Sequence, residues 1–288
     1  MVSRRTARPS MSDPTAAQPA ATFAAKSAKV ALVSGGGTGI GAATARNLAT
    51  RGWRVAVCGR RPNLIEQVAS EIGGLAVQAD ITLPGDCERA VVHTMEHFGR
   101  LDGLVLNAGL ARYGSVIELS LEDWRLTLDT NVSAAFYLCR HALAHLCDVG
   151  GAIVAVSSIA ALRFGPSAAA YSASKAALTA LARSIAVDFG PQGVRSNVVC
   201  PGWVRTEMAD EEMSALDVDI DFAYRRVTEH VPARRPGKPS EIAAVIAWLL
   251  SPDASYVNGC VMTVDGGTAI VDAGSTAFLP HESRPDSS

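Results

Sequence analysis

Residues 29–41 read KVALVSGGGTGIG, and the alanine-rich segment that follows them has the composition of a helix. The run of Val, Ala and Leu at 30–33 predicts a buried strand, so the glycines lie in a turn between a strand and a helix. Glycine permits a tight turn and a close approach to a pyrophosphate, while the helix N-terminus presents free N–H groups to phosphate. The GxxxGxG spacing of Gly35, Gly39 and Gly41 therefore predicts a phosphate-binding loop, with a flexible turn as the alternative.

Outward from this unit, short apolar runs alternate with amphipathic segments. The runs are continuous in their apolar character, as in strands covered on both faces, and we expect strands at 29–34, 54–58, 75–79, 103–107, 151–157, 194–200 and 260–264. Helices are expected between them at 39–51, 62–72, 84–98, 120–147, 168–189 and 239–250. This order predicts an α/β fold: a single-domain Rossmann-type doubly wound sheet of seven parallel strands flanked by helices, over residues 29–268.

Three segments stand outside this alternation. Residues 207–235 form an acidic-then-basic helical insertion, which we expect to act as a substrate lid. Residues 1–28 are rich in Ala, Pro, Ser, Thr and Arg without apolar periodicity, which indicates a disordered N-terminal extension. Residues 269–288 form a C-terminal tail whose first half is apolar; either a neighbouring subunit covers it or it folds back on its own subunit.

Composition excludes several classes of function. The 288-residue chain is 48% hydrophobic and 19% charged, with a net charge of −2, so it has no general attraction to nucleic acid or to an anionic membrane. No apolar run reaches the roughly 18–20 residues that span a bilayer. The six cysteines lack CxxC spacing, and the pairs His93/His97 and His141/His145 lack the glutamate of an HExxH motif, so we expect no metal site. We expect a cytoplasmic protein.

A second constellation lies in the expected helix 168–189. Tyr171 and Lys175 are four residues apart, which places both side chains on one face of that helix. A phenol titrates near 10, and a neighbouring ammonium favours the phenolate and lowers that pKa towards useful acid/base strength. Ser158 follows the expected strand 151–157, so its hydroxyl is placed to polarise a substrate carbonyl. These three residues predict a proton-transfer site.

The motifs occur in an order that resembles the short-chain dehydrogenase/reductase family, in particular its subgroup similar to 3-oxoacyl-carrier-protein reductases. The resemblance covers residues 29–268 and rests on SGGGTGIG, Asp80, Asn107-Ala108-Gly109, Asn131, Ser158, Tyr171 to Lys175, Pro201-Gly202 and Asp265-Gly266-Gly267. It implies an NAD(P)-dependent enzyme that transfers a hydride between the nicotinamide and a secondary alcohol or ketone.

The resemblance also implies roles for the catalytic residues. Tyr171 is the acid/base, Ser158 orients the substrate, and Lys175 lowers the pKa of Tyr171 and holds the nicotinamide ribose. Asn131 matches a fourth position that holds a water linking Lys175 to solvent, although by its sequence alone it is equally a hydrogen-bonding residue inside a helix. The expected cofactor-binding residues are Gly35, Gly37, Thr38, Gly39, Ile40, Gly41, Arg60, Arg61, Asp80, Ile81, Asn107, Ala108, Gly109, Tyr171, Lys175, Pro201, Gly202, Val204 and Thr206.

The choice between NAD and NADP depends on the end of the second strand. An acidic residue there binds the ribose 2′-hydroxyl of NAD and repels a 2′-phosphate. Here the chain reads Gly59-Arg60-Arg61, without a carboxylate, and arginine binds phosphate through paired charge-assisted hydrogen bonds. The sequence favours NADP over NAD, unless Arg60 stacks on the adenine and tolerates both.

The substrate class is less constrained. Carrier proteins are acidic, and the expected helix ends at 147–151 and 188–192 contain no Lys or Arg to receive one. This favours a free alcohol or ketone over a 3-oxoacyl-carrier-protein or acyl-CoA substrate. A non-catalytic cofactor-binding protein is the third interpretation, against which the four catalytic residues argue. We also expect a homo-oligomer, a tetramer by resemblance. The expected pocket is mixed apolar with possible cations, at Leu110, Arg112, Ile159, Arg163, Phe164 and Trp203.

Overall fold

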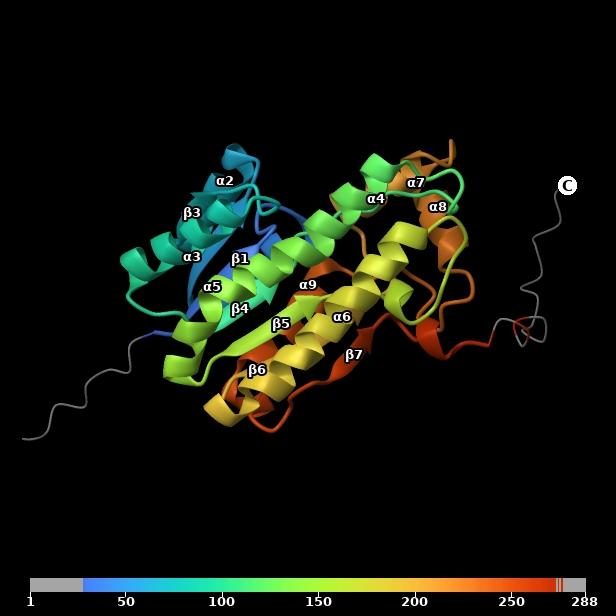
Figure 1. Cartoon of the computed structure of the whole chain (residues 1–288). Coiled ribbons are helices and arrows are strands. Elements are labelled where there is room, and N and C mark those ends of the chain that lie inside the picture. Colours follow the sequence, from blue (N-terminus) through green and yellow to red (C-terminus); the bar gives the residue numbers. More distant parts are fainter. Residues whose placement is uncertain (1–27, 273, 275, 277–288) are drawn as a thin grey trace, which may run out of the picture.

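The computed structural model describes residues 28–272 together with Gly274 and Thr276, and it contains a parallel sheet of seven strands. The strands follow the order β3-β2-β1-β4-β5-β6-β7 (Figure 1). Their bounds are β1 Val30–Ser34, β2 Arg54–Gly59, β3 Leu75–Gln78, β4 Gly103–Leu106, β5 Ala152–Val156, β6 Arg195–Pro201 and β7 Val261–Val264. In register, Val33 of β1 pairs with Val57 of β2 on one side and Val105 of β4 on the other. The expected doubly wound fold is confirmed.

Helices cover both faces of this sheet. Their bounds are α1 Gly39–Thr50, α2 Pro62–Ile72, α3 Pro84–Phe98, α4 Leu121–Leu128, α5 Ala134–Val149, α6 Ala169–Phe189, α7 Glu207–Ser214, α8 Ile220–Val227 and α9 Pro239–Leu250. On β1, Val30 and Leu32 pack towards α3, α5 and α6, whereas Ala31 and Val33 pack towards α1, α2 and α9. Because each strand is buried on both faces, its sequence is continuously apolar.

The structure corrects the single helix expected over 120–147. A π-helical turn, Asp129–Ser133, separates α4 from α5, and the Ala134 N–H donates to the Asp129 carbonyl five residues back. The turn carries Asn131, whose side-chain amide bonds Leu110 and Ser174 instead of facing solvent. π turns of this kind are frequent at functional sites.

The segment expected as a lid folds into two short helices, α7 and α8. Met213 of α7 is buried against Ala223 and Tyr224 of α8, and the Tyr224 hydroxyl donates to the Asp210 carboxylate at 2.8 Å. Figure 1 shows the pair at the end of the molecule where α4 and the start of α6 lie. The segment therefore has a small apolar core of its own, separate from the two that cover the sheet.

The two terminal segments lie largely outside the described residues. This applies to residues 1–27 of the expected extension, and to 273, 275 and 277–288 of the expected tail. The described start of the tail is a 3₁₀ turn, Thr268–Ile270, in which Ile270 is 82% exposed. Within residues 28–272, Gly274 and Thr276, no helix is long and apolar enough to cross a membrane.

Candidate active site

The expected catalytic residues meet at the carboxyl end of the sheet. Ser158 follows β5, Tyr171 and Lys175 lie in the first two turns of α6, and Asn131 lies in the π turn. The Lys175 ammonium donates to the Val156 carbonyl at 3.1 Å. In a doubly wound sheet this end of the strands, near the point where the strand order reverses, is where ligands bind.

Asn131 joins this group through buried hydrogen bonds. Its amide nitrogen donates to the Ser174 hydroxyl at 2.9 Å, and Ser174 donates to the Tyr171 carbonyl at 2.7 Å. The same side chain exchanges two bonds with the backbone of Leu110, each at 2.9 Å. Asn131 therefore fixes the start of α6 and the loop after β4 relative to each other.

Burial shifts the pKa values of the two expected catalytic groups on α6. Lys175 is 4% exposed, and burial lowers its pKa from 10.5 to about 8. Tyr171 as a residue is partly exposed, but burial raises the pKa of its hydroxyl to about 12, although a hydrogen bond with Ser158 acts in the lowering direction. The expectation that Lys175 lowers the pKa of Tyr171 stays a prediction; in this structure desolvation of the phenolate is the largest contribution to that pKa.

The glycine loop has the geometry expected of a phosphate-binding loop. Gly35 and Gly39 have φ values of +63° and +52°, a region that side chains rarely adopt. A Cβ at Gly41 would lie 2.1 Å from the Gly35 carbonyl oxygen, so only glycine fits. Thr38 begins α1 without a side-chain hydrogen bond to the helix. The loop and the N-terminus of α1 thus fit the pyrophosphate of a dinucleotide, which would be held by backbone N–H groups.

Other residues expected to contact the cofactor border this loop. Gly37 and Ile40 lie within it, and a Cβ at Gly39 would lie 3.2 Å from the Thr206 methyl carbon. Asn107 lies beneath the loop, where its amide donates to the carbonyls of Ser34 and Gly35 at 3.0 and 3.2 Å. The Asn107 side chain therefore supports the loop.

The remaining expected contacts lie along the same edge of the sheet. A Cβ at Gly109 would lie 3.2 Å from the Lys175 ammonium, so the backbone passes directly over that group. Asp80 and Ile81 follow β3, and the Asp80 carboxylate accepts hydrogen bonds from Thr82. Ala108 follows Asn107, while Pro201 ends β6 and is followed by Gly202 and by Val204, which is buried.

The two arginines after β2 have different surroundings. Arg61 forms a two-pronged ion pair with Glu207, with both N···O distances at 2.8 Å, and approaches the Thr38 hydroxyl at 3.4 Å. Arg60 is exposed, and no ion pair joins it to another described residue. The sequence did not predict the contact between Arg61 and Glu207, because Glu207 lies 146 residues further along the chain, at the first residue of α7.

The two cations expected in the substrate pocket already have partners. Arg112 pairs with Asp123 at 3.2 Å, and Arg163 donates to the Ala269 carbonyl. Sequence reasoning also missed two residues here. The ring of Tyr113 lies 6.4 Å from that of Tyr171, centre to centre, and the Tyr113 hydroxyl bonds the Glu212 carboxyl from α7. Nothing in the acidic run 210–212 distinguishes Glu212 from its neighbours.

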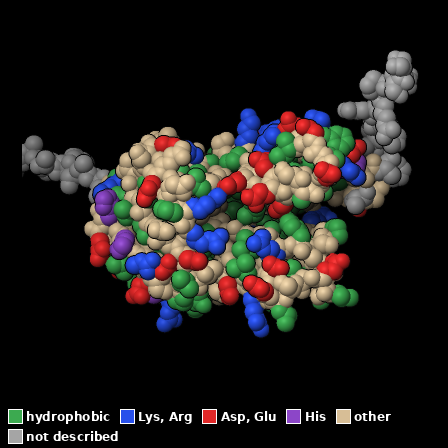
Figure 2. Space-filling view, turned by 90° about the horizontal axis from the view of Figure 1, so that it is seen from above, with side chains coloured by type: hydrophobic (Ala, Val, Ile, Leu, Met, Phe, Trp, Pro, Cys, Tyr) green, Lys and Arg blue, Asp and Glu red, His purple; other side chains and the backbone are tan. Residues whose placement is uncertain are grey.

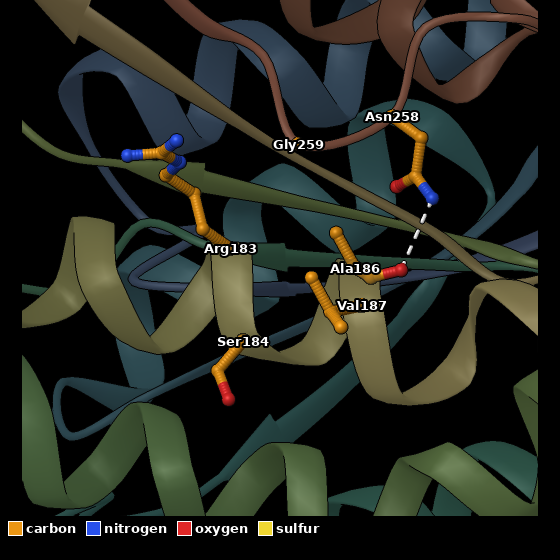
Figure 3. A pocket seen from close by; sticks show the side chains of 6 residues that line it. All are labelled: Arg183, Ser184, Ala186, Val187, Asn258 and Gly259. Carbon is orange, nitrogen blue, oxygen red and sulfur yellow. Dashed lines mark hydrogen bonds between the residues drawn. The ribbon is translucent and has the colours of Figure 1, made fainter.

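The surroundings of the site carry both signs of charge. Figure 2 looks onto the end where α2, α4 and α7 lie, and acidic and basic side chains alternate there without a continuous basic patch. A separate surface hollow of about 490 Å³ lies between α6 and the segment before β7 (Figure 3). It contains none of the expected site residues and is lined by Arg183, Ser184, Ala186, Val187, Asn258 and Gly259.

A phosphate-binding loop beside a buried lysine, a tyrosine and a serine is the site of a dinucleotide-dependent oxidoreductase. Comparison with known proteins also indicates an oxidoreductase. A family model described as enoyl-(acyl carrier protein) reductase matches residues 35–269. The chain is 40% identical to Protein MoaE of Klebsiella aerogenes, over 87% of this chain and 99% of that one. It is 34% identical to the meso-2,3-butanediol dehydrogenase of Serratia marcescens, over 85% and 96%.

A solved structure shows the same architecture. The crystal structure of levodione reductase superposes with a TM-score of 0.82 at 31% identity, over 85% of this chain and 98% of that one. The chain belongs to the short-chain dehydrogenase/reductase family. It is an NAD(P)-dependent oxidoreductase that interconverts alcohols and ketones.

Proposed function

We propose that this enzyme uses NADP in preference to NAD and acts on a free secondary alcohol or ketone, with Tyr171 as its acid/base. The observation that carries the proposal is the buried network in which Asn131, Ser174 and Lys175 hold the start of α6, with Tyr171 beside Ser158. A non-catalytic cofactor-binding protein would not require a buried ammonium next to a phenol, because burying that ammonium costs free energy.

The residues have distinct roles in this proposal. The bound cofactor supplies or accepts the hydride. The Tyr171 hydroxyl, protonated at neutral pH since burial raises its pKa, donates a proton to the carbonyl oxygen during reduction. Ser158 orients that oxygen, and Lys175 binds the nicotinamide ribose and returns a proton to Tyr171. Asn131 positions Lys175 and Tyr171 through Ser174 and holds the water that connects Lys175 with solvent.

The preference for NADP is supported by the charges after β2. No carboxylate stands where β2 ends, and the exposed Arg60 guanidinium is available to a 2′-phosphate. Arg61 is shared with Glu207, so its contribution to phosphate binding competes with an existing ion pair. In the alternative, Arg60 stacks on the adenine and the enzyme accepts both cofactors.

A free small molecule is supported as the substrate by the charge of the surrounding helices. The C-terminal ends of α5 and α6 contain no Lys or Arg, and α7 is acidic, so an acidic carrier protein would meet no complementary surface there. The names of the butanediol dehydrogenase and the levodione reductase denote small diols and diketones. The description of the matching family model keeps a carrier-protein or acyl-CoA reductase as the second candidate.

Initial-rate measurements test both parts of the proposal. We expect a higher kcat/KM with NADPH than with NADH when neutral ketones are reduced. We also expect neutral ketones to be reduced with a higher kcat/KM than acyl thioesters that carry a 3-oxo group. A better kcat/KM with NADH would overturn the cofactor preference, and efficient reduction only of acyl thioesters would overturn the substrate class.

We propose further that the protein is a cytoplasmic homotetramer. Phe136 of α5 is 47% exposed and Val187 of α6 is 76% exposed, which supports pairing of these two helices with a second subunit. The six free cysteines support a reducing compartment. Light scattering that shows a monomer at micromolar concentration would contradict the tetramer.

A further inference from the structure

A carboxyl group from α7 reaches the catalytic tyrosine. Glu212 is half-buried and accepts a hydrogen bond from the Tyr113 hydroxyl. The Tyr113 ring lies 6.4 Å from that of Tyr171, and the charge of Glu212 acts on the Tyr171 hydroxyl. A substrate whose reacting carbon lies against Tyr171 therefore has Glu212 as a neighbour.

The way α7 packs directs Glu212 to this place. Ala209 and Met213, one turn apart, are buried against α8 and fix the orientation of the helix. A second face of α7 is turned towards the end of β2. On this face Glu207 forms an ion pair with Arg61, and Glu211, four residues later, interacts electrostatically with the same arginine. Glu212 lies on a third face of α7, so it is turned away from Arg61, unlike the other two glutamates of the same helix.

Glu212 lacks a cationic partner among the described residues of the site. Of the nearby arginines, Arg112 pairs with Asp123 and Arg163 donates to a backbone carbonyl. Burial raises the pKa of Glu212, and only the hydrogen bond from Tyr113 opposes that shift. A carboxyl group has two oxygens with about four acceptor positions, so one phenol leaves acceptor capacity open to a ligand.

We propose that Glu212 is a specificity-determining residue that selects substrates with a second hydroxyl next to the reacting carbon. That hydroxyl donates to the free acceptor position of Glu212, whereas a carboxylate or phosphate at the same place is repelled by its charge. This inference rests on the proposed function, because it assumes a free alcohol or ketone at Tyr171. A site built to bond a substrate hydroxyl discriminates strongly against the analogue that lacks it.

The test compares matched alcohols within each enzyme variant. The oxidation substrates are 2,3-butanediol against 2-butanol and 1,2-cyclohexanediol against cyclohexanol. The anionic analogue is 2-hydroxybutyrate, whose carboxylate is attached to the reacting carbon. Glu212→Leu removes both the acceptor and the charge, and we expect the diol-to-monoalcohol ratio in kcat/KM to fall roughly 10–100-fold. Glu212→Gln keeps an acceptor oxygen but removes the charge. It should retain most of the diol preference, while oxidation of the anionic analogue relative to the neutral monoalcohols becomes roughly 10-fold more efficient.

Glu211→Gln is the matched control, since that neighbouring carboxyl lies on the face of α7 turned towards Arg61. It should leave both ratios unchanged. A ratio within one variant cancels any general loss of activity caused by altered packing of α7. An unchanged diol ratio in Glu212→Leu would overturn the role of Glu212 while the proposed function stands. A wild-type enzyme that oxidises none of the neutral alcohols with either cofactor would overturn the proposed function itself.

Discussion

The two ends of α6 belong to one helix but bury different kinds of side chain. Its first two turns carry Tyr171, Ser174 and Lys175, two of which are buried polar groups with specific hydrogen-bond partners. Its later turns bury apolar residues such as Leu178 and Ala182 and border the hollow of Figure 3. No buried titratable group lines the hollow, whereas the polar end buries the Lys175 ammonium. We therefore expect the position of buried polar groups, and not the volume of a hollow, to mark the catalytic end of α6.

The two ends also differ in what burial does to stability. Leu178 is transferred from water into the core, which stabilises the fold. Lys175 is buried nearly as completely as Leu178, but its side chain ends in a charged ammonium. This ammonium donates a hydrogen bond to the Val156 carbonyl. The lowered pKa of Lys175 measures that unfavourable burial. Burial in α6 therefore stabilises the fold at one end and costs stability at the other, where the expected catalytic groups lie.

The largest expected effect is loss of turnover at the polar end alone. Tyr171→Phe removes the proton that is transferred and little else, so kcat should fall about 10²–10⁴-fold. Binding of the cofactor, followed by protein fluorescence, should change little. Ser184→Ala, at the hollow, is the matched control and should keep full turnover. Retention of more than about a tenth of the activity by Tyr171→Phe would contradict its role.

A smaller effect concerns stability. Lys175→Met should abolish turnover but raise the free energy of unfolding of the cofactor-free protein by about 2–3 kcal/mol at pH 7, since it removes a buried charge. The native pKa of about 8 lies below the ordinary value of 10.5, so the unfolded chain binds more protons between those pH values. Wild-type stability therefore rises with pH across this window, and the advantage of the variant should shrink from pH 8 and vanish near 10.5.

Urea unfolding at pH 7, 9 and 10 measures this difference. Leu178→Ala, one turn further along α6, is the control because it replaces a buried apolar side chain. It should lose about 2–5 kcal/mol at every pH, as cavity-forming substitutions do. A Lys175→Met protein that is less stable than wild type at pH 7 would contradict a net cost of burying the ammonium.

The sequence predicted the fold well because its signals are local. Strands buried on both faces are continuous apolar runs, and each lies within one or two residues of its expected bounds. Pro62, Pro84 and Pro239 occupy first-turn positions and mark the beginnings of α2, α3 and α9 correctly. The four expected catalytic residues also come together, since a parallel sheet brings the ends of its strands to one edge.

Three features of the site could not be read from the sequence. The π turn depends on bonds from Asn131 to Leu110 and Ser174, which are remote in sequence. The contacts of Glu207 and Glu212 depend on how α7 packs, and an acidic run does not say which carboxyl faces inward. The pKa direction of Tyr171 depends on desolvation, which spacing along a helix does not report.

The π turn Asp129–Ser133 has a further consequence, for the phase of the long helical stretch from Leu121 to Val149. A turn closed by a bond five residues back holds one residue more than an α-helical turn. If the same residues closed instead as an unbroken α-helix, one half would rotate against the other by about 100°. Either the side chain of Asn131 or the apolar face of α5 would then leave its place. The extra residue held by the π turn therefore lets Asn131 and the apolar face of α5 keep their places within one continuous helical stretch.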